Sequence, residues 1–404
     1  MNADRRQTRR HLREIADGLR RASRAVRIPY RDRLMYWCYY VGLAHRGKMV
    51  YSPTHDAQYE DGFWKRGYDK YRAKIDARLD RARVRAGIVD VPAFGDGELG
   101  TGDVEQLMRA NIPFVIRGGA AALPVRNWSL EYLGKVAGDC EVPINEADDR
   151  PSADIDRPTK AHHYYAFRRG RLAEVLAAIE NGGRMRATTA EDVMHHDNGR
   201  LRADLDLPWF ERLSGWERSK QHWLRSRLMI GRIVGAQLLV QPPNAFTLWH
   251  AEPGDNFFVL ARGRKTWTLA DPYYTAAMRP RVKTTTNYHG SNIDLREPEH
   301  VLRQRGFLGY LNVPKVRVQL EPGDVLRVPH HWWHSVETQP GDYTVGVSIR
   351  IIGWPTLNSP GYTWLRMLDR QFHELAKAYE RDGRIADRHI SHPRNSRDAG
   401  RESA

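Results

Sequence analysis

Three residues of this sequence have the types and the spacing of a metal-binding site: His250, Glu252 and His334. His250 and Glu252 are two residues apart, so on a β-strand their side chains point to the same face and can reach one ion. His334 must come from a strand that neighbours the first in space. Two imidazoles and one carboxylate form the facial triad that binds non-haem Fe(II) and leaves coordination positions open. The alternative is a metal-free barrel in which these are ordinary buried side chains.

Short strands separated by Gly and Pro would position these residues. The expected strands cover Ile230–Val234, Gln237–Gln241, Asn256–Ala261, Lys265–Ala270 and Tyr343–Ile352. Strands in this arrangement predict a sandwich or barrel, so we expect a mainly β fold. The segment 316–329 supplies a strand, a turn at Glu321-Pro-Gly-Asp324 and a second strand that leads to the remote histidine.

Further motifs accompany the triad in a fixed order. They are Thr247, Asn256, Gly263-Arg-Lys265-Thr-Trp267, Pro322-Gly-Asp324 and Pro329-His-His-Trp-Trp-His334. This set resembles the cupin-like JmjC oxygenases, the group that includes the asparaginyl hydroxylase of hypoxia-inducible factor. The resemblance covers roughly residues 90 to 355. Two positions depart from the family's pattern: Glu252 stands where Asp is commoner, and Ser348 stands where the family has Asn, with Arg350 two residues further on.

The resemblance implies a double-stranded β-helix (jelly-roll or cupin) core with flanking helices, and Fe(II), 2-oxoglutarate and O2 as cofactor and cosubstrates. Lys265 is at the family's position for binding the 5-carboxylate of 2-oxoglutarate, and Thr247 would add a hydroxyl. Arg350 is a rival cation for this role because a guanidinium binds a carboxylate through two hydrogen bonds. Asn256 and Ser348 would hydrogen-bond the metal-bound carboxylate or an iron ligand. No catalytic residue is expected beyond the metal ligands.

The basic character of the chain is concentrated at its N-terminus. Of the 404 residues, positions 1–85 hold 22 Lys and Arg against 10 Asp and Glu, a net +12, while the remainder carries only +3. Residues 1–27 are predicted to be a solvated helix or a disordered arm. Residues 28–60 mix basic and aromatic side chains, which can stack on nucleic-acid bases or pack on the barrel. A 3–4 spacing of apolar residues over 63–85 predicts an amphipathic helix.

Four regions are predicted along the chain. A basic helical extension covers 1–94, followed by a Gly-rich break and a cupin-like oxygenase domain over 95–357. A helix over 358–382 would form a homodimer or pack back on the barrel. The polar tail 383–404 is expected to be disordered.

The function predicted from the sequence is a hydroxylase that acts on a protein or peptide side chain or on a small metabolite. One alternative is a hydroxylase of modified RNA bases that uses the basic N-terminal region. Another is a non-oxygenase cupin that only binds a partner. Two cysteines, Cys38 and Cys140, are too few for a disulfide framework, and no apolar run reaches the ~20 residues that span a bilayer. We therefore expect a cytoplasmic protein with no membrane partner.

Overall fold

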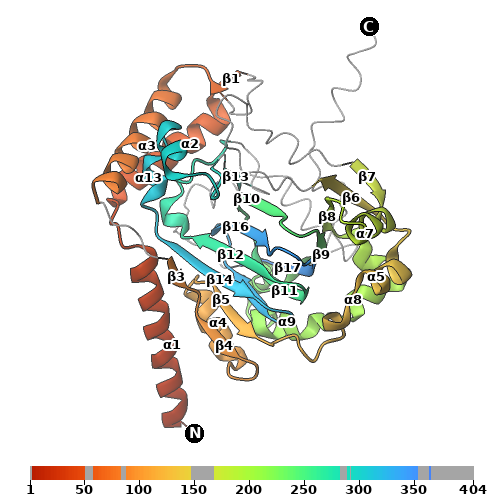
Figure 1. The fold of residues 1–404 in the computed structure, drawn as a ribbon. Helices are drawn as coiled ribbons and strands as arrows, with labels where there is room; N and C mark the ends of the chain where they lie inside the picture. The colour runs from red at the N-terminus through yellow and green to blue at the C-terminus, as the bar shows by residue number, and fades with distance from the viewer. Residues whose placement is uncertain are drawn as a thin grey trace.

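Two large β-sheets form the centre of the molecule, and helices surround them (Figure 1). The computed structural model describes residues 2–50, 58–82, 88–146, 168–282, 289–291, 293–353 and 364. Within these residues the strand order is β13-β10-β16-β12-β14-β3 in the six-stranded sheet and β4-β5-β15-β11-β17-β9-β8-β6-β7 in the nine-stranded sheet. A short pair, β1 (Met49–Val50) and β2 (Gln58–Tyr59), lies apart from both.

The strands are short, and most neighbours run antiparallel. The six-stranded sheet consists of β3 (Ile88–Asp90), β10 (Phe246–Ala251), β12 (Lys265–Ala270), β13 (His289–Gly290), β14 (Lys315–Leu320) and β16 (Trp333–Thr338). The nine-stranded sheet consists of β4 (Ala93–Gly95), β5 (Phe114–Arg117), β6 (Glu141–Glu146), β7 (Arg168–Arg171), β8 (Met185–Ala190), β9 (Ile233–Gln241), β11 (Asp255–Arg262), β15 (Val325–Val328) and β17 (Thr344–Ile351). Over residues 233–351 the chain passes repeatedly between the two sheets, with β12, β13 and β14 following one another in the six-stranded sheet, as expected of a jelly-roll core with an insertion.

Apolar side chains from both sheets meet in the main core. Phe258 of β11 and Trp267 of β12 pack with 4.9 Å between their ring centroids and join the two sheets. On the other face of β11, Phe257 contacts Phe114 and Phe210, so this sheet is covered on both sides. The prediction of a mainly β core of two sheets with flanking helices is confirmed.

One detail of the strand prediction was wrong. The two strands expected at Ile230–Val234 and Gln237–Gln241 are one continuous strand, β9. Gly235 does not mark a turn but lies within the strand, where an added Cβ would come 2.9 Å from Oε2 of Glu191. The glycine leaves room for the close approach of that buried carboxyl group and does not mark a change of direction.

Helices lie on the outside of the sheets. They are α1 (Asn2–Ser23), α2 (Tyr30–Arg46), α3 (Phe63–Ala82), α4 (Thr101–Arg109), α5 (Leu130–Ala137), α7 (Leu172–Glu180), α8 (Arg200–Ala203), α9 (Leu207–Ser214), α10 (Trp216–Lys220), α11 (Trp223–Arg227), α12 (Glu299–Gln304) and α13 (Leu308–Leu311). The aromatic faces of α2 and α3 pack in a second core cluster with Trp249 and Trp333, which lie on β10 and β16. Packing on the barrel accounts for Tyr36, Trp37 and Tyr40, whereas Tyr30 is exposed and Tyr51 lies outside the described residues.

The N-terminal extension makes close contacts with the sheets. Leu12, Ala16 and Leu19 bury one face of α1 in the main core, and Arg24 forms an ion pair with the buried carboxylate of Asp271. Strand β3 pairs with β14 of the six-stranded sheet, and β4, at the expected boundary near residue 95, pairs with β5. The division into separate domains and a role for this extension on nucleic acid both stay predictions.

Two expectations concern residues that the structure does not describe. The helix over 358–382, apart from Trp364, and the tail 383–404 lie outside the described residues, so dimerisation through that helix stays a prediction. Among the helices that are described, none combines the length and the apolar character needed to cross a membrane.

Candidate metal centre

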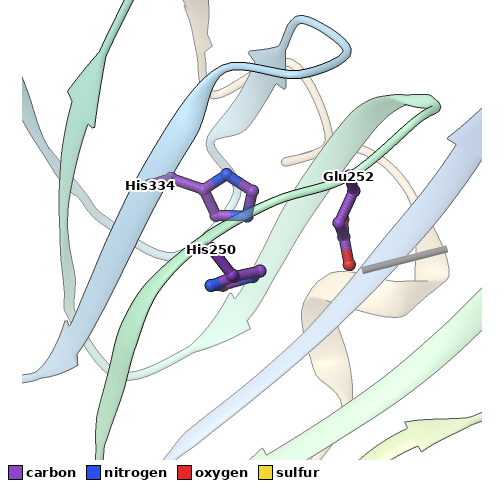
Figure 2. Close-up of side chains that lie close together, drawn as sticks. All are labelled: His250, Glu252 and His334. Carbon is purple, nitrogen blue, oxygen red and sulfur yellow. The ribbon is translucent and has the colours of Figure 1, made fainter. Parts of the chain in front are cut away.

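The three residues of the triad come together at one end of the six-stranded sheet. His250 of β10 lies directly opposite His334 of β16 in the antiparallel register, and Glu252 follows β10 by one residue. One ligand atom from each of the three residues lies within 4.8 Å of the other two, and Figure 2 shows the side chains gathered together. The sequence prediction that these residues converge is therefore matched by the geometry, close enough for a single ion.

An irregularity in β10 shapes this end of the sheet. Thr247 pairs with Val336 and His250 pairs with His334, so three steps on β10 are matched by only two on β16. Such a bulge turns one strand relative to its partner. Because directly opposed residues share a face of the sheet, Thr247 and His250 both face the side on which His334 lies, although they are three residues apart.

Both imidazoles are held in the orientation that a metal ligand needs. Nδ1 of His250 lies 2.9 Å from the Leu248 carbonyl oxygen, and Nδ1 of His334 lies 2.9 Å from the Trp332 carbonyl oxygen. A carbonyl oxygen can only accept, so each Nδ1 carries the hydrogen and each Nε2 keeps its lone pair for a metal.

Burial also keeps these rings neutral. Desolvation lowers the pKa of His334 to about 4. Burial and then the neighbouring His334 hold the pKa of His250 well below 6.5. A neutral imidazole is the form that binds a metal, so both histidines are ready to bind at neutral pH.

The carboxylate of Glu252 is paired with Arg350 of β17. Arg350 Nη2 donates to Glu252 Oε1 over 2.8 Å, and Nη1 contacts Oε2. The pair is mostly buried, with side chains 19% and 12% exposed. Burial outweighs the attraction of the nearby Glu191 and lowers the pKa of Arg350 to about 10. Arg350 therefore lies beside a proposed metal ligand, which disfavours its role as the anchor for the far carboxylate of a cosubstrate.

Lys265 of β12 is a buried cation opposite Thr338 of β16, the strand that also carries His334. It is 1% exposed, and its Nζ donates to Gln241 Oε1 and, over 3.5 Å, to Thr338 Oγ1. No carboxylate within the described ranges forms an ion pair with it. Burial, and after it the buried Arg186, lowers the pKa of Lys265 to about 7. A buried cation flanked by another cation favours the binding of an anion beside it.

Asn256 and Ser348 contact each other rather than the triad. Ser348 Oγ lies 2.9 Å from Asn256 Oδ1 across β17 and β11, and both side chains are buried. Arg350 lies opposite Asn256 in the same pair of strands. These polar groups therefore belong to the wall of the nine-stranded sheet that includes Arg350.

The sequence did not reveal a buried network that ties the two ligand segments together. Asp255 accepts hydrogen bonds from Arg327 and from the backbone and ring of His330, each over 2.8 Å. The backbone N–H of His331 donates to the Glu252 carbonyl oxygen over 2.6 Å. Burial raises the pKa of Asp255, but Arg327 and His330 more than offset this and hold it well below its usual range. In the sequence, this network is indicated only by charged residues such as Asp255 and Arg327, which lie in strands whose other residues are mostly apolar.

Comparison with known proteins agrees with this geometry. A profile of the cupin-like domain family matches residues 103–351, more than half of the chain. The chain belongs to this family. The matched region includes the triad, Lys265 and Arg350, and it begins after α1, α2 and α3.

Several curated proteins are similar over shorter stretches. The HSPB1-associated protein 1 homolog of Danio rerio is 36% identical over 86 residues, which is 21% of this chain and 18% of that protein. JmjC domain-containing protein C of Dictyostelium discoideum is 29% identical over 109 residues, 27% of this chain and 25% of that protein. The bifunctional lysine-specific demethylase and histidyl-hydroxylase NO66 of Aedes aegypti is 27% identical over 150 residues, 37% of this chain and 20% of that protein. The chain spans a quarter or less of the length of these relatives, and they confirm the resemblance to JmjC-type proteins.

Proposed function

We propose that this protein is an Fe(II)- and 2-oxoglutarate-dependent dioxygenase that hydroxylates a protein or peptide side chain or a small metabolite. The observation that carries the proposal is the convergence of His250, Glu252 and His334 within 4.8 Å. The Nδ1 hydrogen bonds that leave each Nε2 free fit a metal ion, and the similarity to the bifunctional lysine-specific demethylase and histidyl-hydroxylase NO66 of Aedes aegypti supports an oxygenase that hydroxylates.

When bound, Fe(II) supplies the redox chemistry in which 2-oxoglutarate, O2 and a substrate C–H become succinate, CO2 and an alcohol. The protein would hold the metal through His250, Glu252 and His334. This three-residue ligand set leaves positions for other molecules. Since all three side chains are mostly buried, bulk water has little access to the centre.

The remaining site residues would bind and orient the cosubstrate. The ammonium group of Lys265 would pair with its far carboxylate, and the hydroxyl of Thr247, on the same face of β10 as His250, would donate a hydrogen bond. The pairing would also relieve the cost of burying the Lys265 charge. The Asn256 and Ser348 pair would shape the opposite wall.

A succinate assay tests this proposal. Purified protein is incubated in air with Fe(II) and 2-oxoglutarate, and succinate is measured by NMR, alone and with candidate peptides or metabolites. We expect metal-dependent succinate formation that His250→Ala abolishes and that the exposed control His300→Ala leaves unchanged. A protein that binds a partner on a cupin barrel without oxidation would form no succinate in any of these reactions.

A further inference from the structure

Trp223, at the start of α11, is the most exposed large apolar side chain in the part of the chain that the structure describes. It is 74% exposed, and Leu224 and Leu228 on the same segment are 43% and 44% exposed. Single exposed apolar residues are common on protein surfaces, but several that lie together mark a binding surface. These three side chains are called the α11 patch below.

Three arginines converge on one carboxylate beside the α11 patch. Arg109 and Arg218 each lie 2.5 Å from an oxygen of Glu105 on α4, and Arg225 of α11 lies 3.4 Å from it. Glu105 is mostly buried, whereas Arg109 and Arg218 are about half exposed. One negative and three positive charges give these four side chains a sum of +2. Glu105 therefore holds guanidinium groups close together at the surface, where they attract anions.

The segment that carries the α11 patch is itself basic. Residues 216–232 hold five Lys and Arg against one Glu, a net +4. Arg227, between Leu224 and Leu228 in the sequence, is exposed. Exposed apolar side chains next to an excess of positive charge are complementary to a partner that is both apolar and acidic.

Both parts of this surface are joined to the metal end of the barrel. Gly231, three residues after the α11 patch, donates its backbone N–H to the Ile352 carbonyl oxygen just beyond β17. The carbonyl oxygen of Asn111, two residues after α4, accepts a hydrogen bond from Nε1 of Trp332 in the segment that leads to His334. A partner bound to this surface is therefore held beside the segments that carry the triad.

A polypeptide fits this surface better than a nucleic acid or a membrane does. Bases stack on planar side chains, so Leu224 and Leu228 contribute little to nucleic-acid binding. A helix that lies in a membrane surface needs an extended apolar face, and α11 has only five residues, little more than one turn. Trp and Arg, by contrast, are among the residue types that dominate the binding energy of protein interfaces.

We propose that the α11 patch and the three arginines on Glu105 form a docking surface for an acidic polypeptide that carries large apolar side chains. Carboxylates of this partner pair with Arg109 and Arg218, and its apolar side chains pack on Trp223. The inference requires no metal, so it is independent of the proposed oxidation chemistry. It adds a class of partner that the triad does not define.

Binding of synthetic polymers to the full-length protein near physiological ionic strength tests this surface. The labelled probes are a random copolymer of Glu and Tyr, poly-Glu of equal length and an oligouridylate, all followed by fluorescence anisotropy. Cosedimentation measures binding to vesicles that contain phosphatidylglycerol. The copolymer should bind most tightly, and Trp223→Ser should weaken it about tenfold or more, as for an aromatic hot spot. Arg218→Gln should weaken it about threefold and make its affinity less sensitive to salt.

Variants at other exposed positions serve as matched controls. Tyr30→Ser removes an aromatic side chain that is 66% exposed, and Arg303→Gln removes an exposed ion pair on α12, so neither should change the affinity for the copolymer. Leu228→Ser, with a loss in the same direction, replaces Trp223→Ser if that variant does not fold.

Three results would overturn the inference. One is equal affinity of the wild type and Trp223→Ser for the Glu–Tyr copolymer. Another is a loss in Tyr30→Ser as large as that in Trp223→Ser, because binding would then not be local to the α11 patch. The third is an oligouridylate or vesicle that binds more tightly than the copolymer and depends on Trp223, which would assign the surface to a nucleic acid or a membrane.

Discussion

Replacing Lys265 with Met should stabilise the protein at neutral pH. The ammonium group is fully buried and has two neutral hydrogen-bond partners, Gln241 and Thr338. Burial lowers its pKa from 10.5 to about 7. At pH 7 the Lys265 amine is fully protonated in the unfolded chain but binds its proton weakly in the folded chain. At 1.36 kcal/mol per pKa unit, this difference lowers the free energy of unfolding by about 4 kcal/mol.

Methionine has a similar length and removes this cost, but it leaves Gln241 Oε1 without the Lys265 donor, while the Thr338 hydroxyl keeps the Thr344 hydroxyl as a partner. An unsatisfied buried acceptor costs about 1–3 kcal/mol, and here the loss falls mainly on Gln241. The desolvation of the charge is the larger effect, so we expect Lys265→Met to raise the free energy of unfolding by about 2 kcal/mol at pH 7.

The pH dependence gives the sign of the effect. Between the folded pKa of about 7 and the unfolded value of 10.5, the unfolded chain binds more protons at this position, so wild-type stability rises with pH. The methionine variant lacks this contribution. Its advantage should therefore fall with pH and reverse to a loss of about 1 kcal/mol near pH 10, where the missing hydrogen bonds outweigh what remains of the cost of burying the charge.

Urea denaturation of both proteins at several pH values between 7 and 10 measures this difference. Groups that titrate equally in both proteins cancel when the two curves are subtracted. A Lys265→Met variant that is destabilised by the same amount at every pH would refute the reasoning, because the lysine would then be an ordinary satisfied side chain. Added Mn²⁺ and 2-oxoglutarate should stabilise the wild type more than the variant, since the ligand would pair with the charge.

Three other predictions follow from the buried groups. The pKa of His334 lies at about 4, so Mn²⁺ affinity should change less than threefold between pH 7 and pH 5 on account of this ligand, and a steep loss near pH 6.5 would contradict its burial. Asp255→Asn leaves the buried Arg327 without its counter-charge and should cost about 3–5 kcal/mol in urea denaturation. Leu12→Ala should cost about 2–5 kcal/mol because α1 is part of the main core; a value near zero would mean that α1 is a detachable arm.

The sequence predicted the parts of the site that depend on local spacing. The spacing of two predicts that His250 and Glu252 come together, and their ligand atoms do lie within 4.8 Å, although Glu252 is one residue beyond the end of β10. Strand β12 has the bounds expected, Lys265–Ala270, because local sequence pattern is a strong signal for a strand.

The sequence could not predict contacts between distant segments. The Arg350–Glu252 pair joins residues 98 positions apart, and nothing near either residue indicates the other. The Asp255 network was hidden for the same reason, because its arginine and histidine come from a different strand and loop. The burial of Leu12 in the main core was also missed, since the charge of α1 suggested a solvated helix. Tertiary packing, rather than local propensity, decides all three.

Calorimetric titration of 2-oxoglutarate into the protein with and without Mn²⁺ tests the central claim most directly. If His250, Glu252 and His334 hold a metal that the cosubstrate binds, 2-oxoglutarate should bind at least tenfold more tightly when Mn²⁺ is present, and His334→Ala should remove this gain. Equal affinity with and without the metal in the wild-type protein, or an undiminished gain in His334→Ala, would contradict the account.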